Sequence, residues 1–172
     1  GAMANTFLAA QGKKLGRSRV EEDKLALART LLQKAADRSV EVLLPVDLRA
    51  GVSLEDTTAT IYPVDAFPEN EMALDIGPET AEKYASRLKH ASTVLWNGPM
   101  GLFENPAFGE GTLAVAHAMA ECPGFTVVGG GDSVAAVEQA GLSHRYRHVS
   151  TGGGASLEYL EGRKLPGVEA LR

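Results

Sequence analysis

The segments TVLWNGPMGLFE (93–104), FTVVGGGDS (125–133) and HVSTGGGAS (148–156) share one pattern, a short apolar run followed by a glycine-rich turn. Each of them predicts a strand, a turn and the start of a helix. Glycines at such a turn remove the side chains that would keep a ligand away from the backbone, and the next helix presents unpaired N–H groups and the positive end of its dipole. One turn of this kind is weak evidence for a phosphate site, but three in one chain are hard to explain by turn chemistry alone.

The rest of the chain alternates between helix and strand patterns. Helical spacing of apolar residues predicts a short helix over 5–11 and a long one over about 19–37, whose apolar stripe should cover a sheet. A near-continuous apolar run predicts a buried strand over 40–48, and the alternating run 58–67 predicts an edge strand or an antiparallel pair. The segment 72–80 predicts another strand that runs into a helix.

This alternation predicts the fold class. Parallel strands need helical crossovers, so the pattern indicates a three-layer αβα sandwich of the α/β class with a mainly parallel, Rossmann-like sheet. Ligands of such sheets bind at the carboxyl ends of the strands, where the three glycine turns fall. The chain opens on a helix, whereas such a sheet normally opens on a strand, so we expect the first strand or strands to be lacking.

Composition limits the classes of function. At 172 residues, with 44% hydrophobic and 23% charged residues, the chain predicts one packed domain. A net charge of −5 without blocks of like charge argues against a nucleic-acid partner or a membrane surface. The single Cys122 excludes an internal disulfide framework, and together with the lack of an apolar run near ~20 residues it favours a cytoplasmic location. We interpret residues 1–3 as an expression scar in which Met3 is a candidate native residue.

The exact strings carry a resemblance to a known family. In this order, WNGPMGLFE (96–104), GGGDS (129–133), STGGGASLEYLEG (150–162) and LPGVEAL (165–171) strongly resemble the nucleotide-binding, C-terminal half of phosphoglycerate kinases. Three further strings resemble the intervening segments of that family: NTFLAAQG (5–12), LPVD (44–47) and LDIGP (74–78). The resemblance implies that residues 4–172 are a partial nucleotide-binding C-terminal domain. It also implies transfer of a phosphoryl group between 1,3-bisphosphoglycerate and ADP, giving 3-phosphoglycerate and ATP, with Mg²⁺.

The resemblance also assigns site residues. Asp132 matches the aspartate that holds the Mg²⁺ of the nucleotide, although an Asp at a helix start also serves as an N-cap. Glu104 matches the glutamate that bonds the ribose hydroxyls, and Leu74 matches an apolar wall near the adenine or, equally, a core residue. Trp96 we interpret as core. The remaining residues expected to line the nucleotide site are Asn97, Gly98, Pro99, Gly129, Gly130, Gly131, Ser133 and Gly153.

Two glycines are expected to act on the transferring group itself. Gly131 belongs to the backbone that approaches the phosphoryl group, and Gly152 belongs to the second glycine patch, which faces the bound substrate and helps to stabilise its charge. Ser133 keeps a hydroxyl that can reach a phosphate or cap the helix.

Other parts of the family's enzyme have no counterpart in these residues. We expect the N-terminal domain that binds 3-phosphoglycerate and the lysine-bearing loop on the nucleotide phosphates to be absent, so that the chain alone is inactive. The parent enzyme is expected to be a monomer. A rival interpretation is a non-catalytic nucleotide-binding or interaction module that keeps the glycine turns. A dinucleotide-dependent oxidoreductase is disfavoured, because no GxGxxG opens a first βαβ unit.

Overall fold

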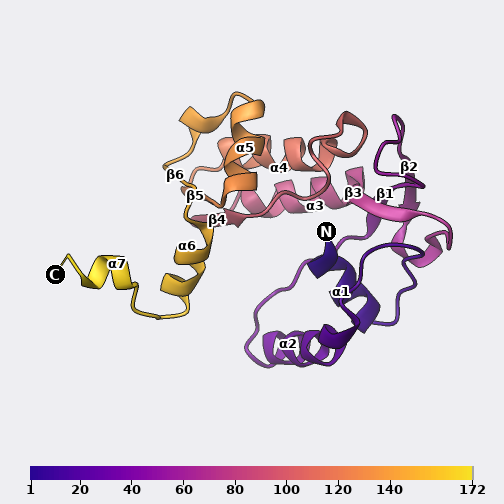
Figure 1. The fold of residues 1–172 in the computed structure, drawn as a ribbon, viewed down its shortest axis with the longest axis horizontal. Coiled ribbons are helices and arrows are strands. Elements are labelled where there is room, and N and C mark those ends of the chain that lie inside the picture. The colour runs from indigo at the N-terminus through magenta and orange to yellow at the C-terminus, as the bar shows by residue number, and fades with distance from the viewer. Residues whose placement is uncertain (172) are drawn as a thin grey trace. The chain divides into compact units, whose positions relative to one another are not determined.

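A computed structural model describes residues 1–171 of the chain (Figure 1). Its internal contacts divide it into two compact units. The first unit comprises residues 1–86 and 100–115, and the second comprises residues 87–99 and those from 116 onward. Two helices, α3 (Pro78–Leu88) and α4 (Glu110–Ala120), contribute residues to both units.

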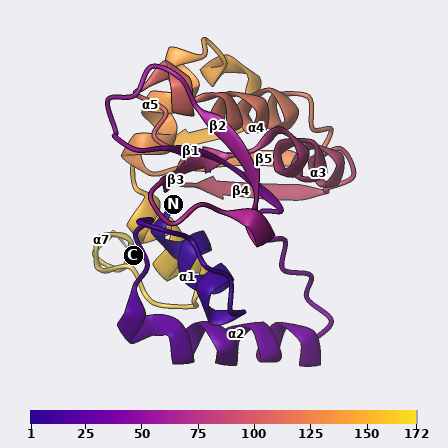
Figure 2. The same cartoon turned by 90° about the vertical axis from the view of Figure 1, so that its right-hand side faces the viewer.

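The first unit contains an antiparallel sheet (Figure 2). Its strands are β1 (Asp47–Gly51), β2 (Thr60–Pro63) and β3 (Met72–Ile76), in the order β2-β1-β3. The register places Leu48 opposite Tyr62 on one side and opposite Ile76 on the other. The expectation of an edge strand or antiparallel pair within 58–67 is therefore confirmed, because β2 is the outer strand and runs antiparallel to β1.

Two N-terminal helices accompany this sheet. Helix α1 (Ala2–Ala10) supplies Leu8 to a core cluster that also contains Leu48 and Phe67. Helix α2 (Leu25–Asp37), preceded by the 3₁₀ turn η1 (Glu22–Lys24), packs mainly against α1, beside which it lies in Figures 1 and 2. Only Ala28 of α2 is buried, while Leu27 and Leu31 are exposed. The predicted apolar stripe of this helix is thus only partly covered, and mainly by a helix.

The prediction of a strand over 40–48 is wrong for most of its length, because β1 begins only at Asp47. Backbone groups of the run bond to side chains instead of to a strand: Val46 N–H donates to Thr80 Oγ1 at 3.0 Å, and the Leu43 carbonyl accepts from the Tyr84 hydroxyl at 3.1 Å. Pro45 also lacks an N–H for a ladder. Apolar composition alone does not make a strand where no neighbouring strand pairs with it.

The second unit contains the parallel sheet. Strands β4 (Thr93–Asn97), β5 (Phe125–Gly129) and β6 (His148–Ser150) are hydrogen-bonded in the order β4-β5-β6. Helix α5 (Gly131–Gln139) packs on β5 and β6, and its Val137 and the Val128 of β5 are completely buried. The predicted three-layer α/β sandwich with a parallel sheet is confirmed by this arrangement and by the solved structures described below.

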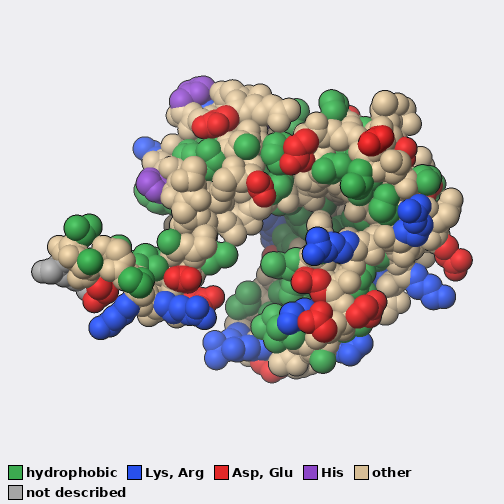
Figure 3. Space-filling view, in the orientation of Figure 1, with side chains coloured by type: hydrophobic (Ala, Val, Ile, Leu, Met, Phe, Trp, Pro, Cys, Tyr) green, Lys and Arg blue, Asp and Glu red, His purple; other side chains and the backbone are tan. Residues whose placement is uncertain are grey.

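Short elements complete the chain. They are η2 (Val64–Ala66), η3 (Pro106–Phe108), η4 (Ser143–Arg145), α6 (Gly153–Leu160) and α7 (Pro166–Glu169). Helices α6 and α7 carry exposed apolar side chains, among them Tyr159, Leu160 and Val168, and green side chains are visible along this segment in Figure 3. Within residues 1–171, no helix combines the length and the apolar character that a membrane crossing requires.

Candidate functional site

The three glycine turns follow strand ends that lie in one row. In the parallel register, Asn97 of β4 pairs with Gly129 of β5, and Gly129 pairs with Ser150 of β6. The next residue of the β5 turn, Gly130, donates its N–H to the Ser150 carbonyl at 2.9 Å. The sheet therefore brings all three turns to one carboxyl edge, as predicted from the alternating pattern.

Two of these glycines are needed for close packing of the turns. A Cβ atom at Gly153 would lie 2.5 Å from Asn97 Oδ1 and 2.7 Å from Gly130 Cα. A Cβ atom at Gly130 would lie 2.9 Å from the same Asn97 oxygen, and Gly130 has a φ of +94°, which disfavours any side chain. The Asn97 side chain, the β5 turn and the α6 start are thus packed directly on one another.

Other glycines at this edge leave the backbone open. A Cβ atom would meet nothing within 4 Å at Gly98, Gly131 or Gly154. Gly131 is the first residue of α5, and neither α5 nor α6, whose N-caps are Gly130 and Gly152, has a side-chain cap. The first N–H groups of two helices therefore face no capping side chain at the edge where the strands end.

The two polar residues after Gly131 differ in their surroundings. Ser133 is completely buried, and its Oγ accepts the Gly98 N–H at 2.6 Å, so it joins the β4 turn to α5. Asp132 is exposed in the first turn of α5, and no described residue donates a hydrogen bond to it. The alternative role of Asp132 as the N-cap is not observed, because the cap position belongs to Gly130.

A metal at this edge would have Asp132 as its one protein carboxylate. Among residues 1–171 no three His, Cys, Asp or Glu side chains gather as a metal-binding group. Mg²⁺ is commonly held by one or two carboxylates together with phosphate oxygens and water, so a single exposed carboxylate beside open N–H groups fits Mg²⁺ that arrives with a nucleotide.

Trp96 is a core residue, as interpreted from the sequence. It is 5% exposed, and its Nε1–H donates to the Gly98 carbonyl at 2.6 Å. The indole therefore supports the β4 turn from inside the unit and offers no surface for stacking a base.

The predicted residues Leu74 and Glu104 belong to the first unit, and Pro99 is the last residue of the second unit before the chain returns to the first. Leu74 lies in β3, is half-buried, and accepts the Leu102 N–H at 2.8 Å through its carbonyl. Glu104 is exposed in the loop between β4 and α4. Leu74 and Glu104, which are expected around the nucleoside, therefore belong to a different unit from the glycine turns that follow β5 and β6.

Sequence reasoning did not identify Asp75, which is 3% exposed at the end of β3. Its Oδ2 accepts the Gly111 N–H at 2.7 Å, and its Oδ1 accepts the Ile76 N–H at 2.8 Å. Burial raises the pKa of the Asp75 carboxyl to about 6, against the lowering effect of these hydrogen bonds and of the nearby Arg49 guanidinium. The signal available in the sequence was the single acid within the apolar run MALDI.

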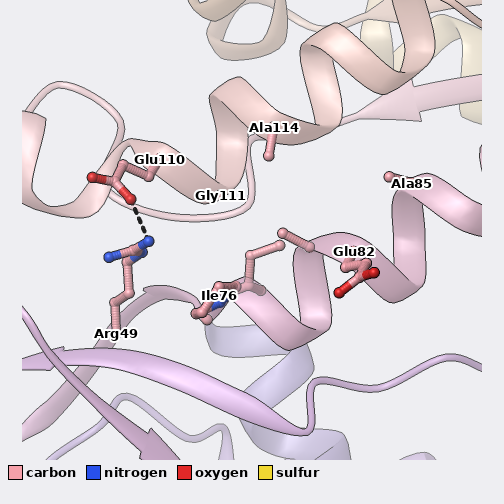
Figure 4. A pocket seen from close by; sticks show the side chains of 10 residues that line it. Arg49, Ile76, Glu82, Ala85, Glu110, Gly111 and Ala114 are labelled. Carbon is pink, nitrogen blue, oxygen red and sulfur yellow. Dashed lines mark hydrogen bonds and ion pairs between the residues drawn. The ribbon is translucent and has the colours of Figure 1, made fainter.

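A shallow pocket of about 330 Å³ lies in the first unit (Figure 4). Its lining includes Arg49, Ile76, Ala81, Glu110 and Ala114, and Figure 4 shows Arg49 of β1 reaching Glu110 at the start of α4, with which it forms an ion pair. None of the site residues predicted from the sequence lines this pocket. Its one cation, Arg49, is ion-paired with Glu110, and a second acid, Glu82, also lines it, which disfavours a phosphate ligand.

Comparison with known proteins agrees with the resemblance seen in the sequence. The family model "Phosphoglycerate kinase" matches residues 1–163. The phosphoglycerate kinase of Anaeromyxobacter sp. (strain Fw109-5) is 58% identical over 172 residues, which are 99% of this chain and 43% of that protein. The phosphoglycerate kinase of Roseiflexus castenholzii is 56% identical over 99% of this chain and 44% of that protein.

Solved structures show the same relationship. The structure of phosphoglycerate kinase from Coxiella burnetii superposes with a TM-score of 0.93 and 44% identity over 98% of this chain and 44% of that one. The phosphoglycerate kinase of Pyrococcus horikoshii OT3 gives 0.82 and 32% identity over 98% and 42% of the two chains. The chain spans less than half the length of these relatives, and it belongs to the phosphoglycerate kinase family.

Proposed function

We propose that this chain forms the nucleotide-binding part of a phosphoglycerate kinase and binds ADP or ATP with Mg²⁺ at the carboxyl edge of its parallel sheet. The observation that carries the proposal is the set of open glycines, Gly98, Gly131 and Gly154, beside two helix starts without side-chain caps. Such an edge offers backbone N–H donors and two positive dipole ends to phosphate oxygens.

The phosphates would lie against the turn that begins α5. Gly129 ends β5, Gly130 is the packed residue of this turn, and Gly131 is the position where a phosphate can approach the backbone without meeting a side chain. At α6, Gly152 is the N-cap and Gly153 is the packed residue. In phosphoryl transfer most catalysis is positioning and neutralisation of charge, which fixed N–H groups can supply without a reacting side chain.

Asp132 would hold the Mg²⁺ that accompanies the nucleotide. Its carboxylate is exposed in the first turn of α5, so it stands next to the N–H groups proposed to bind phosphate. When bound, Mg²⁺ supplies neutralisation of the negative charge on the phosphates. Ser133 contributes indirectly, because its Oγ fixes the Gly98 turn.

We expect four further residues to contact the nucleoside. Glu104 would accept hydrogen bonds from the ribose hydroxyls, and Leu74 would supply apolar contact near the adenine. Asn97 and Pro99 would line the site on the side of the β4 turn. Exposure of Glu104 on a loop supports its availability to a ligand.

The reaction of the parent enzyme would be phosphoryl transfer between 1,3-bisphosphoglycerate and ADP, a step of glycolysis in the cytoplasm. We expect 3-phosphoglycerate to be bound by a part of the enzyme that these 172 residues do not contain, and we expect the chain alone to transfer nothing. In a coupled assay with MgATP and 3-phosphoglycerate the purified chain should be silent. Turnover that survives removal of host kinase would contradict this assignment of roles.

Calorimetric titration with ADP, in the presence and absence of Mg²⁺, tests the binding proposal. Asp132→Ala should weaken MgADP binding by about tenfold while leaving free ADP nearly unchanged, because only the metal link is lost. The matched control is Glu138→Ala, which removes another exposed acid from α5 away from its start. Equal loss with and without Mg²⁺ would assign Asp132 a structural role, and absence of heat at millimolar MgADP would overturn the proposal.

A further inference from the structure

One buried carboxylate contacts both ends of the loop that carries Glu104. This loop, residues 101–111, begins next to Asp75, since a Cβ atom at Gly101 would lie 2.5 Å from Asp75 Oδ1. It ends at Gly111, whose N–H donates to Asp75 Oδ2 at 2.7 Å. Gly111 is equally close, because a Cβ there would lie 2.4 Å from Asp75 Oδ1. The two ends of the loop therefore both lie against the Asp75 side chain of β3.

Additional contacts hold the first half of the loop. Leu102 N–H donates to the Leu74 carbonyl at 2.8 Å, next to Asp75 in β3. Thr112 Oγ1 accepts the N–H groups of Met100 and Gly101, at 3.0 and 3.3 Å. The loop start is therefore fixed by β3 on one side and by the first turn of α4 on the other.

The second half is held equally firmly. Asn105 donates its side-chain amide to the carbonyls of Leu54 and Asp56, at 2.8 and 2.9 Å. Phe108 is completely buried. At the end of the loop, Glu110 forms an ion pair with Arg49, as the dashed line in Figure 4 shows. Between these contacts Glu104 remains exposed.

We propose that Asp75 is a positioning residue for nucleotide binding. By fixing loop 101–111, it holds the Glu104 carboxylate where it can accept hydrogen bonds from the ribose hydroxyls. The inference rests on the proposed function, because it concerns the same nucleotide. Asp75 itself is buried and does not contact the ligand. Both of its oxygens are used, Oδ1 by Ile76 N–H and Oδ2 by Gly111 N–H, so an amide at this position loses one of the two acceptors.

The test compares MgADP with Mg²⁺ and 2′,3′-dideoxy-ADP, which lacks both hydroxyls. The wild-type chain should prefer ADP by about tenfold, since hydrogen bonds to a charged acceptor are among the stronger ones. Glu104→Ala should abolish this preference. Asp75→Asn should reduce the preference to about twofold or less. The double variant should show the same preference as Glu104→Ala alone, because both substitutions act on the same interaction with the ribose hydroxyls.

Asp47→Asn is the matched control. Asp47 is also a buried carboxylate of the first unit, and it accepts the N–H groups of Glu79 and Thr80 at the start of α3, away from the loop. This variant should keep the tenfold preference even where it weakens binding of both nucleotides. If Asp75→Asn does not fold, Thr112→Val releases the loop start by removing the acceptor of Met100 and Gly101, and should show the same loss of preference.

Amide hydrogen exchange supplies a readout that does not depend on the nucleotide. In Asp75→Asn the amides of Leu102 and Gly111 should exchange faster, while those of Glu79 and Thr80 keep their protection. Unchanged exchange of Leu102 and Gly111 would overturn the inference. So would faster exchange with an undiminished preference for ADP, since Asp75 would then be structural only. Absence of any MgADP binding to the wild type would overturn the proposed function as well.

Discussion

Glycines serve two different purposes in this chain, and each unit supplies a clear example of one of them. In the first unit they make room for buried carboxylates: a Cβ atom at Gly77 would lie 2.2 Å from Asp47 Cγ, and one at Gly111 would lie 2.4 Å from Asp75 Oδ1. In the second unit, Gly131 and Gly154 lie at helix starts where a Cβ would meet nothing within 4 Å. The comparison teaches that a glycine near a site is informative only when its surroundings are known. A packed glycine supports the fold, and an open glycine leaves space for a ligand.

The largest expected effect is at a packed glycine. Gly77→Ala should lower the free energy of unfolding by about 3 to 5 kcal/mol, because the new methyl group displaces the Asp47 carboxylate from the first N–H groups of α3. Urea denaturation followed by circular dichroism measures this. Gly154→Ala, at an open position of α6, is the control and should change stability little. A Gly77→Ala chain as stable as the wild type would show that the contact with Asp47 is easily relieved.

The next effect is a pH dependence that originates at Asp75. Its pKa is raised in the folded state, so its contribution to stability is complete below pH about 4 and is lost as the pH rises through about 6. Between pH 4 and 7 the wild type should lose about 3 kcal/mol of unfolding free energy relative to Asp75→Asn, at about 1.4 kcal/mol for each pH unit between the two pKa values. Arg49 and the terminal amino group near Asp75 lower its pKa and are present in both proteins.

Urea denaturation at a series of pH values checks this difference. Comparing the two chains at each pH removes the contribution of the other carboxyl groups. Parallel curves for the wild type and Asp75→Asn would contradict this prediction, because they would mean that Asp75 titrates alike in the folded and unfolded states.

The smallest effect on stability is expected at an open glycine of the proposed site. Gly131→Ala should change the unfolding free energy by less than about 1 kcal/mol, because Ala is a better helix former and meets no neighbouring atom. MgADP affinity should nevertheless fall by about tenfold or more, since the methyl group occupies the phosphate approach. Ala135→Ser, an exposed change further along α5, is the control. Unchanged affinity in a folded Gly131→Ala chain would make this turn structural.

The sequence was sufficient to predict the parallel sheet but not the extent of every strand. Strands β4, β5 and β6 were recognised because each apolar run ends in a glycine turn and runs into a helix. The run 40–46 has the apolar composition of a buried strand. A strand also needs a neighbouring strand to hydrogen-bond with, and composition does not specify that neighbour. For the same reason the stripe of α2 was predicted to face a sheet, although α1 is its main contact.

The candidate site was predictable by position but not by detail. The strings GGGDS and STGGGAS locate two turns, but the sequence does not distinguish the packed Gly130 and Gly153 from the open Gly131, because the contacts of these glycines come from distant segments. Ser133 was expected to reach a phosphate or cap the helix, and its contact with Gly98 depends on two distant segments. Asp75 could not be identified from the sequence, because the role of a buried acid depends on the loop that packs on it.

Titration of the isotopically labelled chain with MgADP, followed by two-dimensional NMR of the backbone amides, tests the central claim most directly. We predict that the largest shifts fall on Gly98, Gly131 and Asp132, at the carboxyl edge of the parallel sheet. The amides of Ala81 and Ala114, which line the pocket of the first unit, should move little. Shifts centred on that pocket, or a spectrum unchanged at millimolar MgADP, would contradict the account.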